Sequence, residues 1–255
     1  KYKARDLMKL IAECAWECGC PGLQYETTIN NWHVAKNTGM INASNPCSEY
    51  MYLDDTSCNL ASLNLQKFRN EDGSIDIPKI EQSIQVFTIA MDLNYQYSSF
   101  PSQEIAQNSF DNRTLGLGYA NLGALIMSEG LPYDSDEARA IAASITALMT
   151  AKVYETSTVM AEKIGTFKRY EENKEPMNQV MEMHRDSLQN IPIEKIPEKF
   201  KPVYERAKTL WNTVIERGKQ FGFRNAQATV LAPTGTIAFM MDCDTTGIEP
   251  DIALV

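Results

Sequence analysis

The chain has 255 residues, a net charge of −9 and a hydrophobic fraction of 44%, the composition of an ordinary globular protein. This acidic balance excludes the basic surface that duplex nucleic acid requires, and no apolar run is long enough to span a bilayer. Six cysteines are too few for a disulfide framework in a chain of this length, so we expect a reducing, cytoplasmic location.

The first quarter of the chain predicts one helix and then extended segments. Apolar residues at helical spacing predict a helix over residues 2–19 that ends at Gly19. Residues 22–30 look extended, and residues 37–53 begin as a loop and end as a strand. Residues 57–68 predict a short strand or an irregular segment, which is followed by a turn at EDGSID.

The rest of the chain is predicted to be mainly helical. The predicted helices cover residues 78–93, 114–130, 134–164 (capped by Asp134 or Ser135) and 203–218. Residues 170–202 are charged and contain prolines, which indicates a surface excursion. Residues 226–232 predict a short buried strand that leads into a helix. This mixture of helix and strand favours the α/β class.

Asn45, Cys47 and Glu49 occupy alternate positions in the sequence SNPCSEY. In an extended backbone these side chains would share one face, while Pro46 favours a loop with the thiol at its tip. A buried cysteine in an edge strand fits the same pattern. A cysteine hydrolase would need a histidine beside the thiol, and a carboxylate disfavours the thiolate. The trio suits chemistry in which sulfur acts as a radical, and the interpretation as a buried edge-strand cysteine stays open at this point.

Two further segments carry weaker signals. Cys58 lies in the apolar sequence TSCNLASLNL and fits either a redox thiol facing the same cavity or simple core packing. In the sequence APTGTI, Gly235 and the hydroxyls of Thr234 and Thr236 would let a helix start receive an anion. A capped helix without a ligand fits equally, and the missing Walker lysine argues against triphosphate hydrolysis.

Three segments, in this order, resemble one enzyme family: TGMINASNPCSEYMYLDDTSCNLASLNL, RTLGLGYANLGALI and NAQATVLAPTGTIAFMMDCDTTGIEP. Together they resemble the catalytic barrel of a ribonucleotide reductase, most of all the adenosylcobalamin-dependent class II kind. The resemblance runs from about Leu23 to the end of the chain. It implies an α/β barrel of ten strands, with a central finger loop that carries the radical cysteine.

The resemblance also implies residue roles. A thiyl radical on Cys47 would remove the 3′ hydrogen of a ribonucleotide, Glu49 would accept the 3′-hydroxyl proton, and Asn45 would bind substrate hydroxyls. Cys58 would be one of two thiols that reduce the 2′ position and end as a disulfide. The implied phosphate-binding residues are Thr234, Gly235, Thr236 and Ile237, and the further implied substrate contacts are Ser44 and Pro233.

The implied domain is one partial catalytic barrel over residues 1–255, its C-terminal portion, without the N-terminal strands or the C-terminal tail. An expressed fragment, a truncated chain or one product of a split gene would fit. The implied cofactor is adenosylcobalamin. The implied partners are the ribonucleotide substrate, nucleotide effectors, a thioredoxin-like reductant and a complementary reductase chain. The sequence CAWECGC matches neither zinc nor ferredoxin spacing, so we expect no metal site.

Three alternatives stay open at this point. The first is a class I-type large subunit that receives its radical from a metal-bearing partner subunit. The second is a non-catalytic assembly chain of a split reductase, and the third and most distant is a cysteine hydrolase. The sequence does not decide between a diphosphate and a triphosphate substrate.

Overall fold

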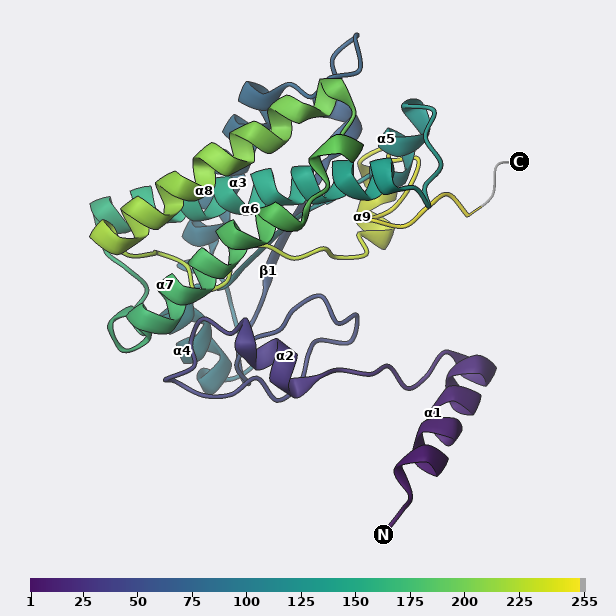
Figure 1. The fold of residues 1–255 in the computed structure, drawn as a ribbon. Coiled ribbons are helices and arrows are strands. Elements are labelled where there is room, and N and C mark those ends of the chain that lie inside the picture. The colour runs from purple at the N-terminus through teal and green to yellow at the C-terminus, as the bar shows by residue number, and fades with distance from the viewer. Residues whose placement is uncertain (253–255) are drawn as a thin grey trace. The chain divides into compact units, whose positions relative to one another are not determined.

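The computed structural model describes residues 1–252 and divides into two compact units (Figure 1). The first unit, Lys1–Trp32, contains helices α1 (Ala4–Cys18) and α2 (Glu26–Asn31). As predicted, α1 ends at Gly19, whose φ of 75° provides the left-handed C-cap that glycine adopts without strain. The second unit begins at His33 and contains the other described elements.

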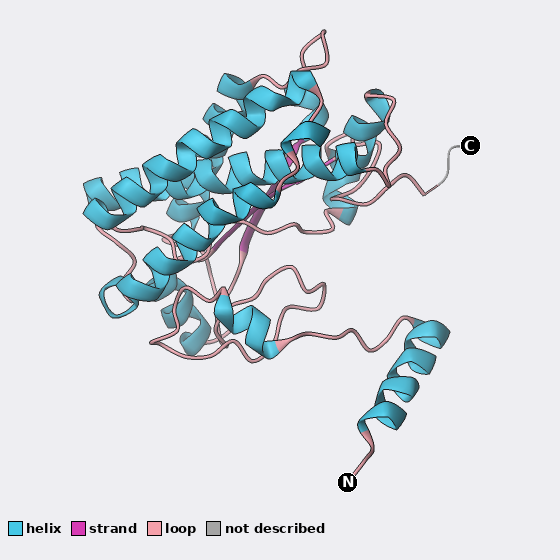
Figure 2. Ribbon diagram, viewed as in Figure 1, coloured by secondary structure: helices cyan, strands magenta, loops and turns pink. Residues whose placement is uncertain are grey.

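The second unit contains a small parallel sheet, drawn in magenta in Figure 2. Strand β1 (Asn59–Asn64) pairs in parallel with β2 (Leu115–Ala120). Residues 227–230 run in the same direction along the other edge of β2. There the N–H of Leu117 donates to the carbonyl of Ala228 (3.1 Å), and the N–H of Val230 donates to the carbonyl of Leu117 (3.1 Å). The carboxyl ends of three parallel segments therefore meet at one edge of the sheet, where ligands commonly bind in α/β proteins.

The described part of the second unit is otherwise mainly helical. Its α-helices are α3 (Ile77–Asn94), α4 (Gln103–Asn112), α5 (Leu122–Ser128), α6 (Asp136–Ile164), α7 (Tyr170–Ser187), α8 (Lys201–Phe221) and α9 (Gly235–Met240). Side-chain oxygens of Asp76, Ser102 and Ser135 accept hydrogen bonds from backbone N–H groups in the first turns of α3, α4 and α6. These caps fix where the three helices begin.

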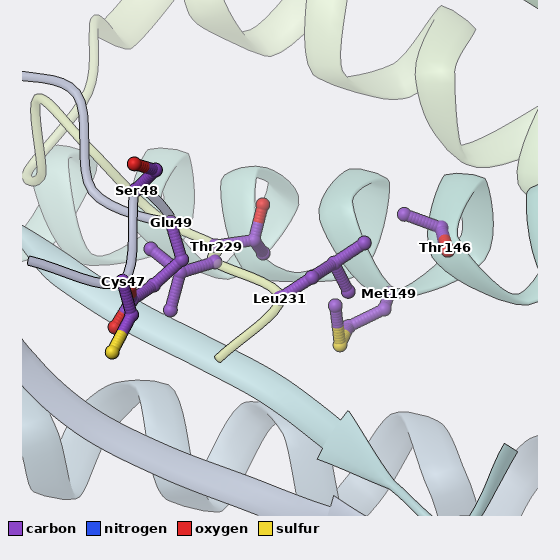
Figure 3. A pocket seen from close by; sticks show the side chains of 8 residues that line it. Cys47, Ser48, Glu49, Thr146, Met149, Thr229 and Leu231 are labelled. Atoms are coloured by element: carbon purple, nitrogen blue, oxygen red, sulfur yellow. The ribbon is translucent and has the colours of Figure 1, made fainter. Parts of the chain in front are cut away.

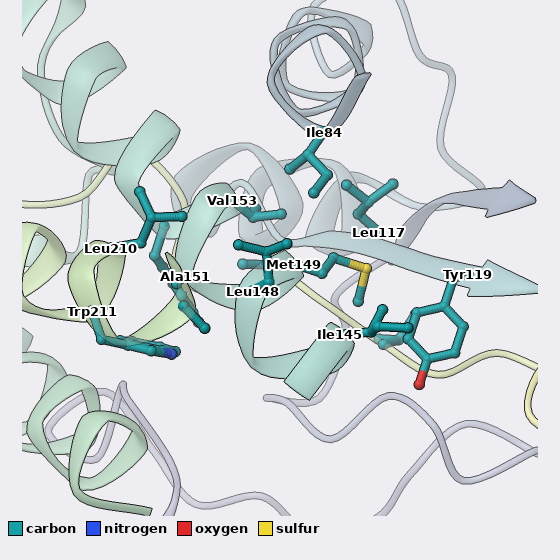
Figure 4. Close-up of a cluster of buried hydrophobic side chains, with 14 of the residues drawn as sticks. Ile84, Leu117, Tyr119, Ile145, Leu148, Met149, Ala151, Val153, Leu210 and Trp211 are labelled. Carbon is teal, nitrogen blue, oxygen red and sulfur yellow. The ribbon is translucent and has the colours of Figure 1, made fainter. Parts of the chain in front are cut away.

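The core lies between the sheet and the helices (Figure 4). Leu117 and Tyr119 of β2 meet Ile84 of α3 and the buried residues of α6, and Trp211 of α8 packs on the outer side of α6. The order of layers is therefore sheet, then α3 and α6, then α8 with α7. The opposite face of the sheet is more open, since Leu60 of β1 is 52% exposed.

Several expectations for individual segments are wrong. The expected packed helix over residues 114–130 is β2 followed by α5, because a run buried on both faces has no period that separates strand from helix. The expected strand at residues 50–53 is reduced to a single bridge between Ser44 and Met51. Residues 22–30 were expected to be extended, but from Glu26 onward they belong to α2.

The segment over residues 170–202 is also not a plain surface excursion. Helix α7 occupies its first half and buries Met177, Val180 and Met181 against the core, and short 3₁₀ turns follow it. The mixed α/β class is confirmed, with much more helix than strand, and residues 1–252 do not themselves form a complete barrel. In that range no helix is long and apolar enough to cross a membrane, and all six cysteines are unpaired.

Candidate functional site

Residues 44–51, here called the thiol loop, form a closed turn with Cys47 exposed at its tip. The N–H of Ser48 donates to the carbonyl of Asn45 (3.0 Å), and the N–H of Asn45 donates to the carbonyl of Tyr50 (3.3 Å). The side-chain oxygen Oδ1 of Asn45 accepts a further hydrogen bond from the N–H of Tyr50 (2.9 Å). The thiol loop is thus held by contacts within itself.

The expected extended geometry of the thiol loop is wrong, although the expected thiol at a loop tip is confirmed. Pro46 occupies the second position of a four-residue turn, where its fixed φ is favourable, and Ser48 has a φ of 63°. Asn45, Cys47 and Glu49 therefore do not share a face by strand alternation. All three residues belong to the thiol loop, in which Asn45 lies at the base and Cys47 at the tip.

A pocket of about 370 Å³ lies beside Cys47 (Figure 3). Its lining consists of Cys47, Ser48 and Glu49 from the thiol loop, Thr146 and Met149 from α6, and Thr229, Val230 and Leu231. Glu49 is half-buried, and its carboxylate oxygen Oε2 is buried without a hydrogen-bond partner. Burying such an oxygen without a hydrogen bond is costly, so Oε2 is an acceptor that the described residues leave unused, on a residue that lines this pocket.

Cys58 lies directly before β1 and does not belong to the lining of the Cys47 pocket. Burial, and secondly the negative charge of Glu49, raise the pKa of the Cys58 thiol to about 12. The thiol is therefore protonated at neutral pH. The charge effect places Glu49 within electrostatic range of Cys58, and Glu49 also lines the pocket beside Cys47.

A network of hydroxyl groups surrounds the backbone on the N-terminal side of Cys58. The Tyr50 hydroxyl contacts the Thr56 hydroxyl (3.0 Å), and the Tyr95 hydroxyl contacts the Thr114 hydroxyl (3.2 Å). The Thr114 hydroxyl in turn donates to the carbonyl of Ser57 (2.5 Å). Burial raises the pKa of both tyrosines, so both stay neutral. The sequence analysis missed this network, since its members are distant in the chain.

The segment 233–237 follows the residues that line the Cys47 pocket. Thr234 has a φ of 49° and is nine-tenths buried, and its hydroxyl oxygen has no hydrogen-bond partner. Gly235, Thr236 and Ile237 form the exposed first turn of α9, where backbone N–H groups have no partners within the helix. The predicted loop-to-helix junction is confirmed, and among the described residues the Thr234 hydroxyl has no hydrogen-bond partner.

Two asparagines hold the turn that follows α9, and the sequence analysis missed both. Oδ1 of Asn121 accepts hydrogen bonds from the N–H groups of Asp244 and Thr245, each at 3.0 Å. Nδ2 of Asn121 donates to Oδ1 of Asn64 (3.0 Å), whose own Nδ2 donates to the carbonyl of Met241 (3.2 Å). Asn64 and Asn121 stand at the carboxyl ends of β1 and β2, so the sheet positions α9 through them.

The structure brings only some of the sequence-predicted residues together. Cys47 and Glu49 share one pocket, whereas Asn45, Ser44 and segment 233–237 are outside its lining. Ser44 donates its hydroxyl to the carbonyl of Asn45 (2.9 Å), and the N–H of Gly247 donates to the carbonyl of Pro233 (2.9 Å). Across residues 1–252 no group of three His, Cys, Asp or Glu side chains is placed to hold a metal ion.

Comparison with known proteins assigns the chain to a family. The family model described as "Ribonucleotide reductase, barrel domain" matches residues 1–255, and the chain therefore belongs to this family. A protein of Rhodopirellula baltica, named vitamin B12-dependent ribonucleotide reductase, is 56% identical over 254 residues, which are 100% of this chain and 24% of that protein.

Two other relatives agree with this assignment. The protein of the same name in Streptomyces clavuligerus is 48% identical over 99% of this chain and 26% of its own length. A vitamin B12-dependent ribonucleoside-diphosphate reductase of Thermoplasma acidophilum is 26% identical over 100% of this chain and 28% of its own length. The chain thus spans about a quarter of the length of the curated relatives that it matches.

Proposed function

We propose that this chain is the part of an adenosylcobalamin-dependent ribonucleotide reductase that presents the substrate-activating thiol, Cys47. The observation that carries the proposal is the exposed thiol of Cys47 at the same pocket as the buried, unpartnered oxygen Oε2 of Glu49. A reaction that removes a hydrogen atom from a sugar carbon and a proton from its hydroxyl needs both groups at one place.

The proposed roles follow from these two groups and Cys58. Cys47, as a thiyl radical, takes the hydrogen atom from C3′ of the ribose and becomes a thiol. Glu49 accepts the proton of the 3′-hydroxyl through its unpartnered oxygen. The 2′-hydroxyl leaves as water with one hydrogen from the pair formed by Cys58 and a second thiol, C2′ receives the other, and the two thiols form a disulfide. Glu49 then returns its proton to the 3′-oxygen, and Cys47 returns its hydrogen atom to C3′ and is again a thiyl radical. The Cys58 pKa of about 12 suits this role, since a protonated thiol carries the hydrogen to be given up.

Substrate binding is proposed for the polar groups that the fold leaves without partners. Oδ1 of Asn45 is used within the thiol loop, so its Nδ2 group is the one proposed to donate to a substrate hydroxyl. The hydroxyl of Thr234 and the first N–H groups of α9, at Gly235, Thr236 and Ile237, are proposed to hold the phosphates. Ser44 and Pro233 would flank the substrate as part of the same surface.

Adenosylcobalamin, when bound, supplies the one-electron oxidising equivalent for Cys47. The described residues fit the thiol side of that step, because Cys47 is exposed at a loop tip where a second molecule can reach it. They also need no metal-ligand cluster, since the corrin itself holds cobalt. The described pockets of about 370 and 560 Å³ suit small ligands.

We also propose that β1, β2 and residues 227–230 are three strands of a ten-stranded barrel whose finger loop is the thiol loop. Residues 1–255 would be the later part of this barrel domain. Support comes from the shared parallel direction of the three segments and from the length of the relatives, about four times that of this chain. The proposed partners are the ribonucleotide substrate, a thioredoxin-like reductant, nucleotide effectors and the remainder of the reductase.

The test is a Cys47→Ser substitution in the complete holoenzyme. Deoxyribonucleotide formation should fall to background, because a serine hydroxyl cannot take the place of a thiyl radical. Cys18→Ser, which changes an exposed thiol of the first unit, is the matched control and should keep its activity. Persisting product formation by Cys47→Ser would refute the proposal.

A second arm of the same experiment identifies the radical source. The wild-type protein is assayed with adenosylcobalamin alone and with a metal-bearing subunit alone. Activity with adenosylcobalamin is the expected result. Activity only with the metal-bearing subunit would replace the cobalamin proposal by the class I-type alternative, and activity with neither would favour a non-catalytic assembly chain.

A further inference from the structure

Gly116 lies on β2 opposite Leu60 of β1 and has an unremarkable backbone conformation. Its φ does not fall in the left-handed region that other residues avoid. Backbone conformation therefore gives no reason for a glycine at this position. Any requirement for glycine must come from the space around it.

That space is occupied by a sulfur atom. A Cβ placed on Gly116 would lie 2.4 Å from Sγ of Cys58, 2.6 Å from Cδ2 of Leu60 and 3.0 Å from Cγ2 of Val230. The first two distances are far inside van der Waals contact, so a side chain at 116 and the Cys58 thiol compete for one volume. We call the volume bounded by Cys58, Leu60, Val230 and Gly116 the Gly116 notch.

The neighbouring glycine on the same face of β2 has a different task. A Cβ on Gly118 would lie 2.4 Å from the carbonyl oxygen of Val230, a backbone atom. Gly118 thus permits the close approach of the segment 227–230 to β2. Gly116 instead makes room for side chains, and the nearest of these is a thiol.

We propose that Gly116 is a positioning residue that holds the Cys58 thiol in the Gly116 notch, on the open face of the sheet. This inference rests on the proposed function only for the role of Cys58 as a reducing thiol. With a hydrogen atom at position 116, the sulfur lies against β2 and is partly buried. A methyl group there would displace the sulfur toward the pocket of about 430 Å³ that Cys58 lines together with Ser57 and Tyr95.

The surroundings of the Gly116 notch favour the protonated form of the Cys58 thiol. Burial is the main cause of the raised Cys58 pKa. The titratable groups that interact with Cys58 are Glu49 and Tyr50 of the thiol loop and Tyr95, which caps the end of α3. Both tyrosines have raised pKa values and stay neutral, so Glu49 contributes the only negative charge among these three groups. A displaced sulfur loses the burial and keeps the weaker effect of Glu49.

The test measures how fast iodoacetamide alkylates Cys58 in the complete protein, as a function of pH. Cleavage after Glu49 separates the Cys47 and Cys58 peptides, so exposed Cys47 is an internal reference in each sample. In Gly116→Ala, the rate at Cys58 relative to Cys47 should rise at pH 8 by at least about tenfold, the gain in thiolate that a pKa lower by one unit gives. The pH profile of Cys58 should shift to lower pH.

Gly118→Ala is the control for general loosening of the sheet. It introduces the same methyl group on the same face of the same strand, but against backbone rather than against the thiol. An unchanged Cys58 rate in Gly116→Ala would overturn the proposal. An equal rise of the Cys58 rate in Gly118→Ala would also overturn it. The thiol would then respond to displacement of the strand in general and not to loss of space in the Gly116 notch.

A double-mutant cycle covers the case in which Gly116→Ala does not fold. Removing the sulfur with Cys58→Ala leaves room for the new methyl group, and the half-exposed Leu60 side chain can rotate away. The double variant should therefore fold even if Gly116→Ala alone does not. If both fold, the thermal midpoint should fall less when Gly116→Ala is added to Cys58→Ala than when it is added to wild type. Additive midpoints, or failure of the double variant to fold, would overturn the proposal. Neither readout depends on turnover, so each is independent of the reductase proposal.

Discussion

At the scale of single residues, two features define the candidate site. The carboxylate oxygen Oε2 of Glu49 is buried without a hydrogen-bond partner, and the Cys58 thiol occupies space that a side chain at position 116 would fill. The two are coupled, because the charge of Glu49 raises the pKa of Cys58. A proton gained by Glu49 therefore makes the Cys58 thiolate easier to form.

This coupling gives a prediction for Glu49→Gln. Removing the negative charge should lower the pKa of Cys58, although burial, the larger cause, should keep it above the ordinary value for a thiol. The measurement is the pH dependence of Cys58 alkylation. Asp55→Asn, which removes an exposed carboxylate close in the chain, is the matched control and should leave the profile unchanged. An unchanged profile in Glu49→Gln would contradict the coupling.

Sequence reasoning reached some of these residues and not others, for a physical reason. Cys47, Glu49 and Thr234 are visible in the sequence because their chemistry is local: a thiol, a carboxylate and a hydroxyl beside a turn. Gly116 and Asn121 act through atoms more than 50 positions away, Gly116 on Cys58 and Asn121 on Thr245. A glycine or an asparagine in isolation does not reveal which distant atom it meets.

At the scale of elements, a buried ion pair joins the end of α3 to the start of β2. Nε and an Nη of Arg113 donate to the two carboxylate oxygens of Asp92 at 2.7 and 2.8 Å, and the two side chains are 2% and 1% exposed. Arg224 and Asn225 also donate to Asp92, at 3.4 and 2.8 Å. The residues that precede segment 227–230 are thereby fixed to the same carboxylate as β2.

We predict that Asp92→Asn destabilises the fold by about 3–5 kcal/mol, because it leaves the guanidinium of Arg113 buried without its counter-charge. Denaturant unfolding monitored by circular dichroism measures the change. Asp134→Asn is the control: it breaks an ion pair with Arg139 in which the side chains are 95% and 61% exposed, and such solvent-screened pairs contribute little to stability. Equal losses in both variants would contradict the argument.

Elements were predictable where a local signal marks them. Ser135 caps α6 as the sequence indicates, and α8 follows its apolar spacing. The sequence of β2 carries no polar residue that would mark an outer face, because all six of its residues are apolar and buried, and its alternation of large residues with glycine or alanine was not recognised as a strand. Helix α7 was missed because its charged residues mask the apolar stripe of Met177, Val180 and Met181, which only packing on α8 explains.

At the scale of the whole molecule, two histidines make stability depend on pH. Burial lowers the pKa of both His33 and His184 to about 4. In the folded protein both rings are therefore neutral above pH 4, whereas in the unfolded chain they take up protons below about pH 6.5. The unfolded state then binds more protons, so stability is full above about pH 6.5 and falls as the pH drops toward 4.

The expected slope is up to about 1.4 kcal/mol per pH unit for each histidine within that window. The free energy of unfolding, measured by denaturant titration at pH 7, 6 and 5, tests it. His184→Phe keeps a flat ring on Trp211, which stacks on His184 with a centroid distance of 5.3 Å, and should reduce the slope. A wild-type stability that does not change between pH 7 and 5 would contradict the prediction.

One feature of the sheet bears on handling the chain by itself. Within residues 1–252, no strand pairs with the outer edge of β1, and Leu60 on that strand is half exposed. A row of backbone donors and acceptors beside apolar side chains is a template onto which another copy can add. Expressed without a covering segment, the chain should self-associate through β1, and charged substitutions at Leu60 should improve its recovery as a monomer.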